Sequence, residues 1–202
     1  MWRSLPAVFL VALVLAFVGA TTSFLAAQET TFQLDPAHTT VKFTLADVLH
    51  TVHGTFKLKS GELDLEPGTR KMSGEIVVDA RSGDSGSGMR DRKMNRDVIE
   101  SERYPTITFR PDGIEGMVTF QGKSSVRVHG IFNIHGVDRE INVPAELEMA
   151  GDQWSAAVHF TIPYAKWGMK NPSTLFLRVS DSVEIDFTAT GTLTRRTAET
   201  AQ

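Results

Sequence analysis

The sequence predicts an all-β protein, an extended antiparallel β-barrel with one short helix between two of its strands. Apolar and polar residues alternate from Thr31 onward, which is the period-two pattern of strands with one dry face. Helical periodicity is nearly missing outside residues 87–101. The alternation predicts roughly eight to ten strands, at the spacing expected of an antiparallel sandwich or barrel, and closing them into a barrel is the simpler way to avoid long exposed sheet edges.

The first half of this sheet contains three alternating segments. Residues 40–46 and residues 51–60 each place their apolar side chains on one face and their polar side chains on the other. Residues 61–80 contain two alternating runs on either side of Pro67-Gly68, a dipeptide typical of turns. This third segment therefore predicts a hairpin.

The second half of the chain repeats the pattern. Five alternating stretches follow one another, namely TITFRPDGIEGMVTF, SVRVHGIFNIHG, REINVPAELEM, QWSAAVHFTI and SVEIDFTATGTL. Between the two halves, residues 87–101 are the one segment whose apolar residues have helical spacing. Ser85 or Ser87 can cap the start of this helix, and Pro105 prevents its continuation.

The N-terminus predicts an export signal. A cationic start is followed by a long uncharged, mostly apolar stretch with small residues suited to cleavage after Ala20 or Ala27. Cleavage after Ala27 divides the chain into a signal peptide (residues 1–27), a barrel domain (28–193) and a disordered polar tail (194–202). The protein is then periplasmic or secreted. The competing interpretation is an uncleaved membrane anchor, because the stretch is long enough to span a bilayer of about 30 Å.

The composition limits the classes of function. The 202 residues carry a formal net charge of -3 and a pI of about 6.1, which argues against a nucleic-acid binder that relies on neutralising phosphates. Cysteine is absent, which excludes a disulfide scaffold and a thiolate-bound metal. The six histidines lack the spacings of shared metal ligands. We therefore expect no metal site and no other cofactor.

Residues 83–86, with the sequence Gly-Asp-Ser-Gly, look like the nucleophile loop of chymotrypsin-type serine proteases. A serine nucleophile of that kind needs a histidine base and an orienting carboxylate. Only about 55 residues precede Ser85 in the mature domain, too few to build the first barrel of such a protease. We interpret the segment as a flexible connector and expect no catalytic residues in the chain.

Large apolar residues lie on the predicted inner faces of the strands. A filled core is the simpler interpretation, but a barrel of this many strands can also enclose an apolar cavity for a ligand. Alternation alone does not separate the two. The residues that would line such a cavity are Phe43, Phe56, Phe109, Phe132, Trp154, Phe160 and Phe187.

Four segments of the chain match the motifs of one known family. They are FQLDPAHTTVKFTLADVLHTVHGTF, RDRKMNRDVIESERYPTITFRP, GIFNIHGVDREINVPAELEM and VSDSVEIDFTAT, in that order. On these motifs, residues 32 to about 192 resemble the YceI-like family, which is also called polyisoprenoid-binding-protein-like. The matched positions include Asp35 with His38, Arg90 with Asp91, Tyr104 with Pro105, and His135 with Gly136. The chain departs from the family pattern at Ala46-Asp47-Val48, where Lys-His-Leu is common.

The resemblance implies a lipocalin-like barrel that binds a long-chain amphiphilic lipid, such as a polyisoprenoid or a fatty-acid-like molecule, in its interior. The seven aromatic residues above would then contact the apolar chain. Cations at the helix, namely Arg90, Arg92, Lys93 and Arg96, would attract an anionic headgroup or a membrane surface. Alternatively, these cations form a solvated helix face that is balanced by Asp91, Asp97 and Glu100.

Two other functions remain open at the level of the sequence. One is a lipid-modifying enzyme on the same barrel, with His38 or His135 as the acid or base. The other is a structural or stress-related envelope protein with a filled barrel. The sequence does not determine the oligomeric state and leaves a homodimer open.

Overall fold

The computed structural model describes residues 28–47, 50–174 and 178–197, so the predicted signal peptide lies outside the described residues. Within these ranges, no helix is long and apolar enough to cross a membrane. The strands are β1 (Gln28–Leu34), β2 (Thr40–Ala46), β3 (Thr51–Glu66), β4 (Lys71–Asp84), β5 (Thr106–Glu115), β6 (Gly122–Ile134), β7 (Val137–Ala150), β8 (Gln153–Ile162) and β9 (Val183–Thr197). The helical segment between β4 and β5 consists of α1 (Gly88–Lys93) and the π-helical η1 (Met94–Val98).

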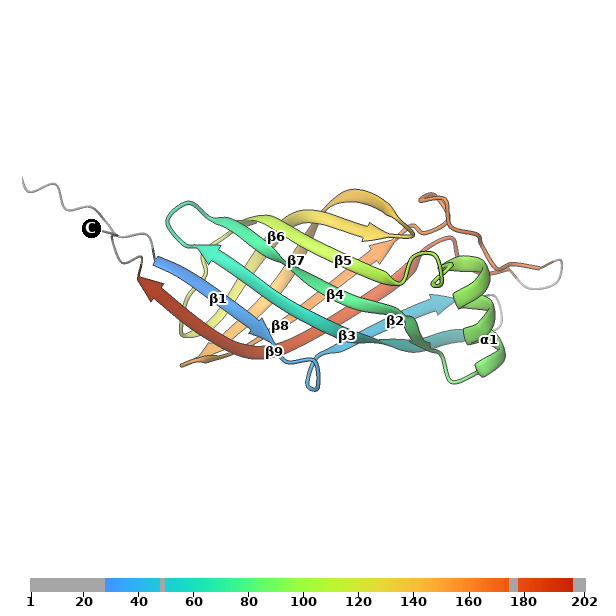
Figure 1. Cartoon of the computed structure of the whole chain (residues 1–202), viewed down its shortest axis with the longest axis horizontal. Helices are drawn as coiled ribbons and strands as arrows, with labels where there is room; N and C mark the ends of the chain where they lie inside the picture. The colour runs from blue at the N-terminus through green and yellow to red at the C-terminus, as the bar shows by residue number, and fades with distance from the viewer. Residues whose placement is uncertain (1–27, 48–49, 175–177, 198–202) are drawn as a thin grey trace, which may run out of the picture.

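The sheet is antiparallel throughout and closes on itself. Both β1 and β2 pair with β3 on one side and with β9 on the other, at different heights along these two long strands. The two short strands therefore share one position, and the nine strands occupy eight positions around the barrel. Figure 1 shows the elongated barrel with α1 at one end and the start of β1 at the other. The predicted fold class is confirmed.

The third strand is longer than the alternation suggested. Residues 51–66, which we divided into two stretches before Gly61, form the single 16-residue strand β3. Gly61 lies within the strand and pairs with Ile76 of β4. The absence of a Cβ at Gly61 leaves room for the Leu34 side chain, which occupies that space. The predicted hairpin between β3 and β4 is confirmed, with its turn at residues 67–70. The register of this pair shifts between Thr55 and Lys57 and again between Leu58 and Ser60.

The last strand extends beyond the predicted end of the barrel domain. We placed the start of a disordered tail at residue 194, but β9 continues to Thr197. The prediction was wrong for residues 194–197 because their backbones pair with Gln28–Thr31 of β1. That pairing gives this polar segment hydrogen-bond partners which are invisible in the sequence. Residues 198–202 lie outside the described residues.

The short helix occurs where the sequence predicts it. Helical structure spans residues 88–98 within the predicted 87–101, and it changes from α to π geometry at Met94. Ser87 occupies the position before the first turn but makes no capping hydrogen bond with its side chain. The segment ends before Glu100, whose φ of 51° is left-handed and incompatible with continuing the helix.

Two of the family-matching motifs contact each other at the end of the barrel nearest the helix. His135 and Gly136 have φ values of 56° and 71°, and this pair of positive values makes the tight turn between β6 and β7. The Tyr104 ring lies 4.6 Å from the His135 ring, centroid to centroid. A Cβ at Gly136 would meet the Tyr104 ring, so the glycine is required for this contact as well as for the turn. Pro105 then leads into β5 at Thr106.

A substitution at Gly191 tests the closure of the barrel. At this residue β9 pairs with Leu34 of β1. A Cβ at Gly191 would meet the backbone carbonyl oxygen of Gln33, which cannot rotate away. We expect Gly191→Ala to lower the free energy of unfolding by about 2 kcal/mol, as overpacking of a well-packed interior does. Gly68→Ala is the control, because a Cβ at this turn residue meets nothing within 4 Å. Equal urea-unfolding curves for the two variants would contradict the proposed role of Gly191.

Candidate ligand-binding cavity

A cavity of about 690 Å³ occupies the interior of the barrel. Side chains from all nine strands line it, together with residues of the helical segment and of the loop that follows β8. This volume lies within the range of small-molecule pockets in proteins, which is about 300–1,000 Å³. The barrel is therefore not filled by its own side chains along its whole length.

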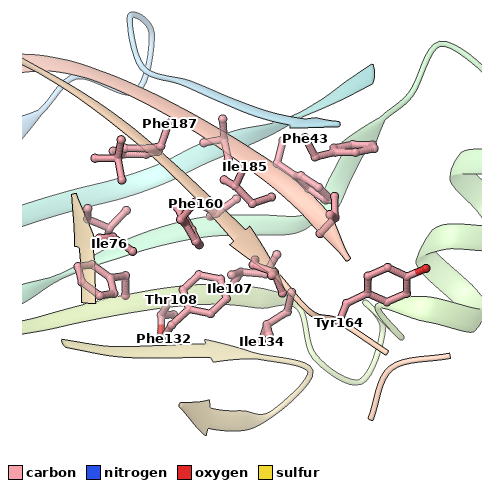
Figure 2. A pocket seen from close by; sticks show the side chains of 18 of the residues that line it. Phe43, Ile76, Ile107, Thr108, Phe132, Ile134, Phe160, Tyr164, Ile185 and Phe187 are labelled. Atoms are coloured by element: carbon pink, nitrogen blue, oxygen red, sulfur yellow. The ribbon is translucent and has the colours of Figure 1, made fainter. Parts of the chain in front are cut away.

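All seven predicted lining residues face this cavity. Figure 2 shows Phe43, Phe132, Phe160 and Phe187 on its wall, among aliphatic neighbours such as Ile185. Some of the rings contact each other. The Phe132 and Phe160 centroids lie 6.0 Å apart in an edge-on arrangement, and the Phe43 and Phe56 centroids lie 5.5 Å apart. Whether these residues contact a ligand stays a prediction. The full predicted set on the wall is Phe43, Phe56, Phe109, Phe132, Trp154, Phe160 and Phe187.

The cavity is long and narrow rather than round. On β8, every second residue from Trp154 to Ile162 lines it, so the lining covers eight residue steps of one strand. At about 3.3 Å per residue, these steps correspond to roughly 26 Å of strand. The far end is closed by buried side chains, with the Trp154 ring packed edge-on against Phe32 at a centroid distance of 5.4 Å. Trp154 Nε1 donates a hydrogen bond of 3.1 Å to the Thr192 carbonyl.

Charge is confined to the opposite end of the cavity, which we call the mouth. The charged residues of the lining are Asp47, Arg90, Arg92, Lys93 and Arg96, and all of them lie at this end. Met89, Arg92 and Arg96 line the cavity and are also exposed, so the cavity reaches solvent here. The mouth therefore has four cations and one carboxylate, in a chain with a net charge of -3.

Ser85 holds the helix at the mouth through hydrogen bonds with Arg90 and Asp91. Its hydroxyl donates a hydrogen bond to the Asp91 carboxylate, and its backbone N–H donates to the same oxygen at 2.9 Å. Arg90 Nε donates to the Ser85 hydroxyl at 2.8 Å, and a second Arg90 nitrogen donates to the Ser85 carbonyl at 2.7 Å. The Arg90-Asp91 pair thus fastens α1 to the end of β4, and no histidine contacts the serine.

The other three predicted headgroup residues differ in what they bind. Lys93 Nζ donates a hydrogen bond of 3.2 Å to the Pro172 carbonyl, and Arg96 forms a bidentate ion pair with Asp97, with N···O distances of 2.7 and 2.9 Å. Arg92 has no hydrogen bond or ion pair with any residue that the structure describes. Of the four cations, Arg92 is therefore the one whose guanidinium is available to a ligand.

Tyr164 at the mouth was missed by the sequence reasoning. It lies in the loop after β8, lines the cavity and donates a hydrogen bond of 2.6 Å to the Ser180 carbonyl (Figure 2). Burial raises the pKa of its hydroxyl to about 12, so the group stays protonated and can donate this hydrogen bond even in alkaline solution. A signal was present, because the alternation of Phe160 and Ile162 continues to Tyr164 beyond the end of the strand.

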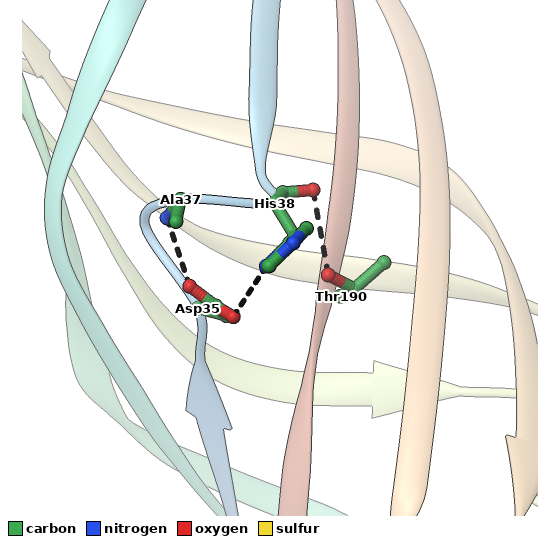
Figure 3. A network of polar contacts seen from close by, with 4 residues as sticks. All are labelled: Asp35, Ala37, His38 and Thr190. Carbon is green, nitrogen blue, oxygen red and sulfur yellow. Dashed lines mark hydrogen bonds and ion pairs between the residues drawn. The ribbon is translucent and has the colours of Figure 1, made fainter.

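No histidine of the described residues lines the cavity. His38 lies outside the barrel, where its Nδ1 is 2.7 Å from an Asp35 oxygen and Asp35 also accepts from the Ala37 backbone N–H (Figure 3). The hydrogen bond from His38 is the main reason that the pKa of Asp35 is lowered. This pair stabilises the turn between β1 and β2. His135 stacks on Tyr104, so neither candidate acid or base faces the cavity.

The part of the chain that the structure describes contains no group of three or more histidine, aspartate or glutamate residues placed to hold a metal ion. Several histidines have single carboxylate partners instead. His129 Nδ1 lies 2.6 Å from Asp112, and His159 Nδ1 lies 2.7 Å from Asp186, both on the outer surface. The hydrogen bond to Asp112 is the main reason that the pKa of His129 is raised.

Comparison with protein families gives a match of residues 32–191 to the model of the YceI-like domain. The chain belongs to the YceI-like family. Among sequence relatives, a UPF0312 protein of Vibrio vulnificus is 30% identical over 122 residues, which cover 58% of this chain and 62% of that protein. A UPF0312 protein of Vibrio parahaemolyticus is 29% identical over 136 residues, which cover 64% of this chain and 70% of that protein.

Solved structures of other bacterial proteins have the same fold. BcnA of Burkholderia cenocepacia superposes with a TM-score of 0.65 at 19% identity, over 79% of this chain and 99% of BcnA. A polyisoprenoid-binding domain of Saccharophagus degradans superposes with a TM-score of 0.61 at 16% identity, over 80% of this chain and 97% of that domain. The predicted family membership and lipocalin-like barrel are confirmed.

Proposed function

We propose that this YceI-like protein binds a long-chain amphiphilic lipid, polyisoprenoid or fatty-acid-like, and sequesters or carries it. The observation that supports this proposal is the polarity of the cavity, which is apolar along its length and charged at the mouth alone. An amphiphile has the same distribution of polarity. The polyisoprenoid-binding domain of Saccharophagus degradans has the same fold and adds support.

Burial of the apolar chain would supply most of the affinity. Each methylene moved from water into an apolar interior contributes about 0.8 kcal/mol. Six buried methylenes would contribute about 5 kcal/mol, before the cost of immobilising the ligand is subtracted. A ligand that fills the cavity toward Trp154 therefore needs few polar contacts, which agrees with the apolar wall.

The headgroup would remain at the mouth beside Arg92. A carboxylate or phosphate there would meet a guanidinium that has no partner in the described part of the chain. Arg90, Lys93 and Arg96 would contribute to the positive potential while keeping their protein partners. The proposed ligand thus carries an anionic headgroup.

The protein would act by binding rather than by catalysis. Neither His38 nor His135 faces the cavity, so the two histidines of the lipid-modifying alternative do not lie beside the proposed ligand. The filled-barrel alternative is disfavoured by the cavity of about 690 Å³.

We further propose that the mature protein works in the periplasm or as a secreted protein. The predicted cleavage after Ala27 would leave intact every strand that the structure describes, since β1 is described from Gln28. Mass spectrometry of the exported protein should give an N-terminus at Gln28. An intact N-terminus at Met1 in the membrane fraction would favour the anchored alternative.

A blocked cavity tests the lipid-binding proposal. Val158 lines the cavity midway along β8, whereas the adjacent Ala157 is exposed on the outer face of the same strand. We expect Val158→Trp to displace about four methylenes of ligand, which corresponds to about 3 kcal/mol and a roughly hundredfold weaker affinity. Ala157→Trp should bind as the wild type does.

The measurement is titration of each purified variant with a fluorescent long-chain fatty acid, after extraction and mass analysis of any lipid that copurifies. Circular dichroism and thermal unfolding would establish that both variants fold. Equal binding by the two variants, or an absence of binding by the wild type, would contradict lipid binding in the barrel.

A charge reversal at Arg92 tests the headgroup site. The Arg92→Glu variant should bind a long-chain carboxylate about tenfold or more weakly, because a charge-assisted hydrogen bond is replaced by repulsion. Its affinity for the uncharged alcohol of the same chain length should be unchanged. Arg81→Glu is the control, since Arg81 is an exposed residue on β4 that does not line the cavity. If Arg92→Glu weakened both ligands equally, the headgroup would lie elsewhere.

A further inference from the structure

Met89 is an exposed apolar residue at the mouth of the cavity. Its side chain is 76% exposed. Among the described residues, the other exposed large hydrophobic residues are Met117, at 76%, and Val137, at 41%. Met89 also contributes to the cavity lining, so it lies at the boundary between the apolar interior and solvent. Exposing this apolar side chain to water has a free-energy cost, and packing inside the barrel does not account for its position.

Cations follow Met89 along one face of the helical segment. Arg92 and Lys93 lie three and four positions after Met89, which are the spacings that share a face of an α-helix, and Arg96 follows in the π-helical η1. All four residues line the mouth. This face is therefore apolar at its start and cationic beyond it, which is the pattern of helices that lie on membrane surfaces.

The carboxylates near this face do not neutralise it. Asp91 binds Ser85, and Glu100 lies 3.1 Å from His135 and 3.9 Å from Arg103. The sequence allowed these two carboxylates to balance the helix cations, and the structure turns both toward other partners.

Asp97 is the remaining carboxylate of the helical segment itself. It is ion-paired with Arg96, and this hydrogen bond together with the nearby charges of Lys170 and Lys93 lowers the pKa of Asp97. Two carboxylates, Asp47 at the mouth and Asp97 in η1, thus lie beside the cations Arg92, Lys93, Arg96 and Lys170.

We propose that this end of the barrel docks onto an anionic lipid bilayer, with Met89 entering the interface and with Arg92, Lys93, Arg96 and Lys170 above the lipid headgroups. The proposal rests on the proposed lipid-binding function, because docking would let a lipid pass between the bilayer and the cavity without crossing water. Positive charge on the docking surface complements the negative surface of such a bilayer. Each cation near the surface strengthens binding roughly fivefold.

The orientation that follows is specific. Figure 1 shows the start of β1 at the end of the barrel opposite α1. A mature protein released from its N-terminal segment can turn its mouth toward any bilayer, whereas an anchor attached at Gln28 would hold the opposite end near its own membrane. Met117, which is also 76% exposed, lies in the β5–β6 loop away from the mouth and serves as an internal control.

Single-cysteine labelling tests the insertion of Met89. The chain contains no cysteine, so Met89→Cys and Met117→Cys can each carry one environment-sensitive dye. With vesicles that contain phosphatidylglycerol, the dye at position 89 should shift to the blue and the dye at position 117 should not. Phosphatidylcholine vesicles should shift neither. A shift at both positions, a shift at neither, or an equal shift with both kinds of vesicle would overturn the proposal.

Charge reversal away from the cavity wall tests the electrostatic part. Lys170 is exposed and does not line the cavity, and Lys123 is an exposed lysine at the start of β6. In vesicle sedimentation, Lys170→Glu should weaken binding to phosphatidylglycerol vesicles about fivefold or more, and Lys123→Glu should change it less than about twofold. Added salt should weaken wild-type binding, because exposed charges are screened. Equal effects of the two lysine variants would contradict docking through the mouth.

The two proposals fail in different ways. Binding of a fluorescent fatty acid in the absence of vesicles reports on the cavity alone, whereas the dye shift and the sedimentation report on docking. A wild type that binds the fatty acid but not the vesicles refutes docking and leaves lipid binding intact. If the dye at position 89 shifts with protein concentration in the absence of vesicles, the surface is a contact between two copies of the chain, and the bilayer proposal is wrong.

Discussion

Closure of the sheet is the constraint on which the rest of the structure depends. Two short strands, β1 and β2, together complete one position between β3 and β9, and every strand of the described barrel thereby has a partner on both sides. Closure turns the apolar face of each strand inward and separates it from solvent. An open sheet with the same alternation would expose that face. The cavity, its closed end and its mouth all follow from this arrangement.

The distribution of charge then gives the cavity a direction. The wall is apolar from Trp154 to the helix, and the charged lining residues belong to the mouth. The apolar wall has no charged groups that could pair with a charged headgroup. A headgroup placed anywhere but at the mouth would therefore lose its hydration at a large cost in free energy. A ligand with one polar end can therefore enter in one orientation. This physical argument does not depend on which lipid occupies the cavity.

The motifs that identify the family have structural roles in this chain. Arg90 and Asp91 hold Ser85 and so fasten the helix over the mouth. The Asp35–His38 contact stabilises the turn at which the chain passes from β1 to β2. These polar contacts fix the places where the barrel departs from regular strands, and the alternating residues between them supply the wall. The same segments also supply part of the apolar wall, because Phe43, Phe109 and Phe132 belong to them and line the cavity.

The sequence by itself determined the strand class, the single helix and the inward faces, because alternation with period two is a local property of the chain. It also indicated the seven aromatic residues of the wall. Tertiary structure decided what depends on contacts between distant segments. Residues 194–197 are a strand because β1 pairs with them, and Arg92 differs from Arg90 because Ser85 binds only the latter. The existence of the cavity was likewise undetermined, since an inward-facing side chain has the same sequence pattern whether the volume beside it is filled or empty.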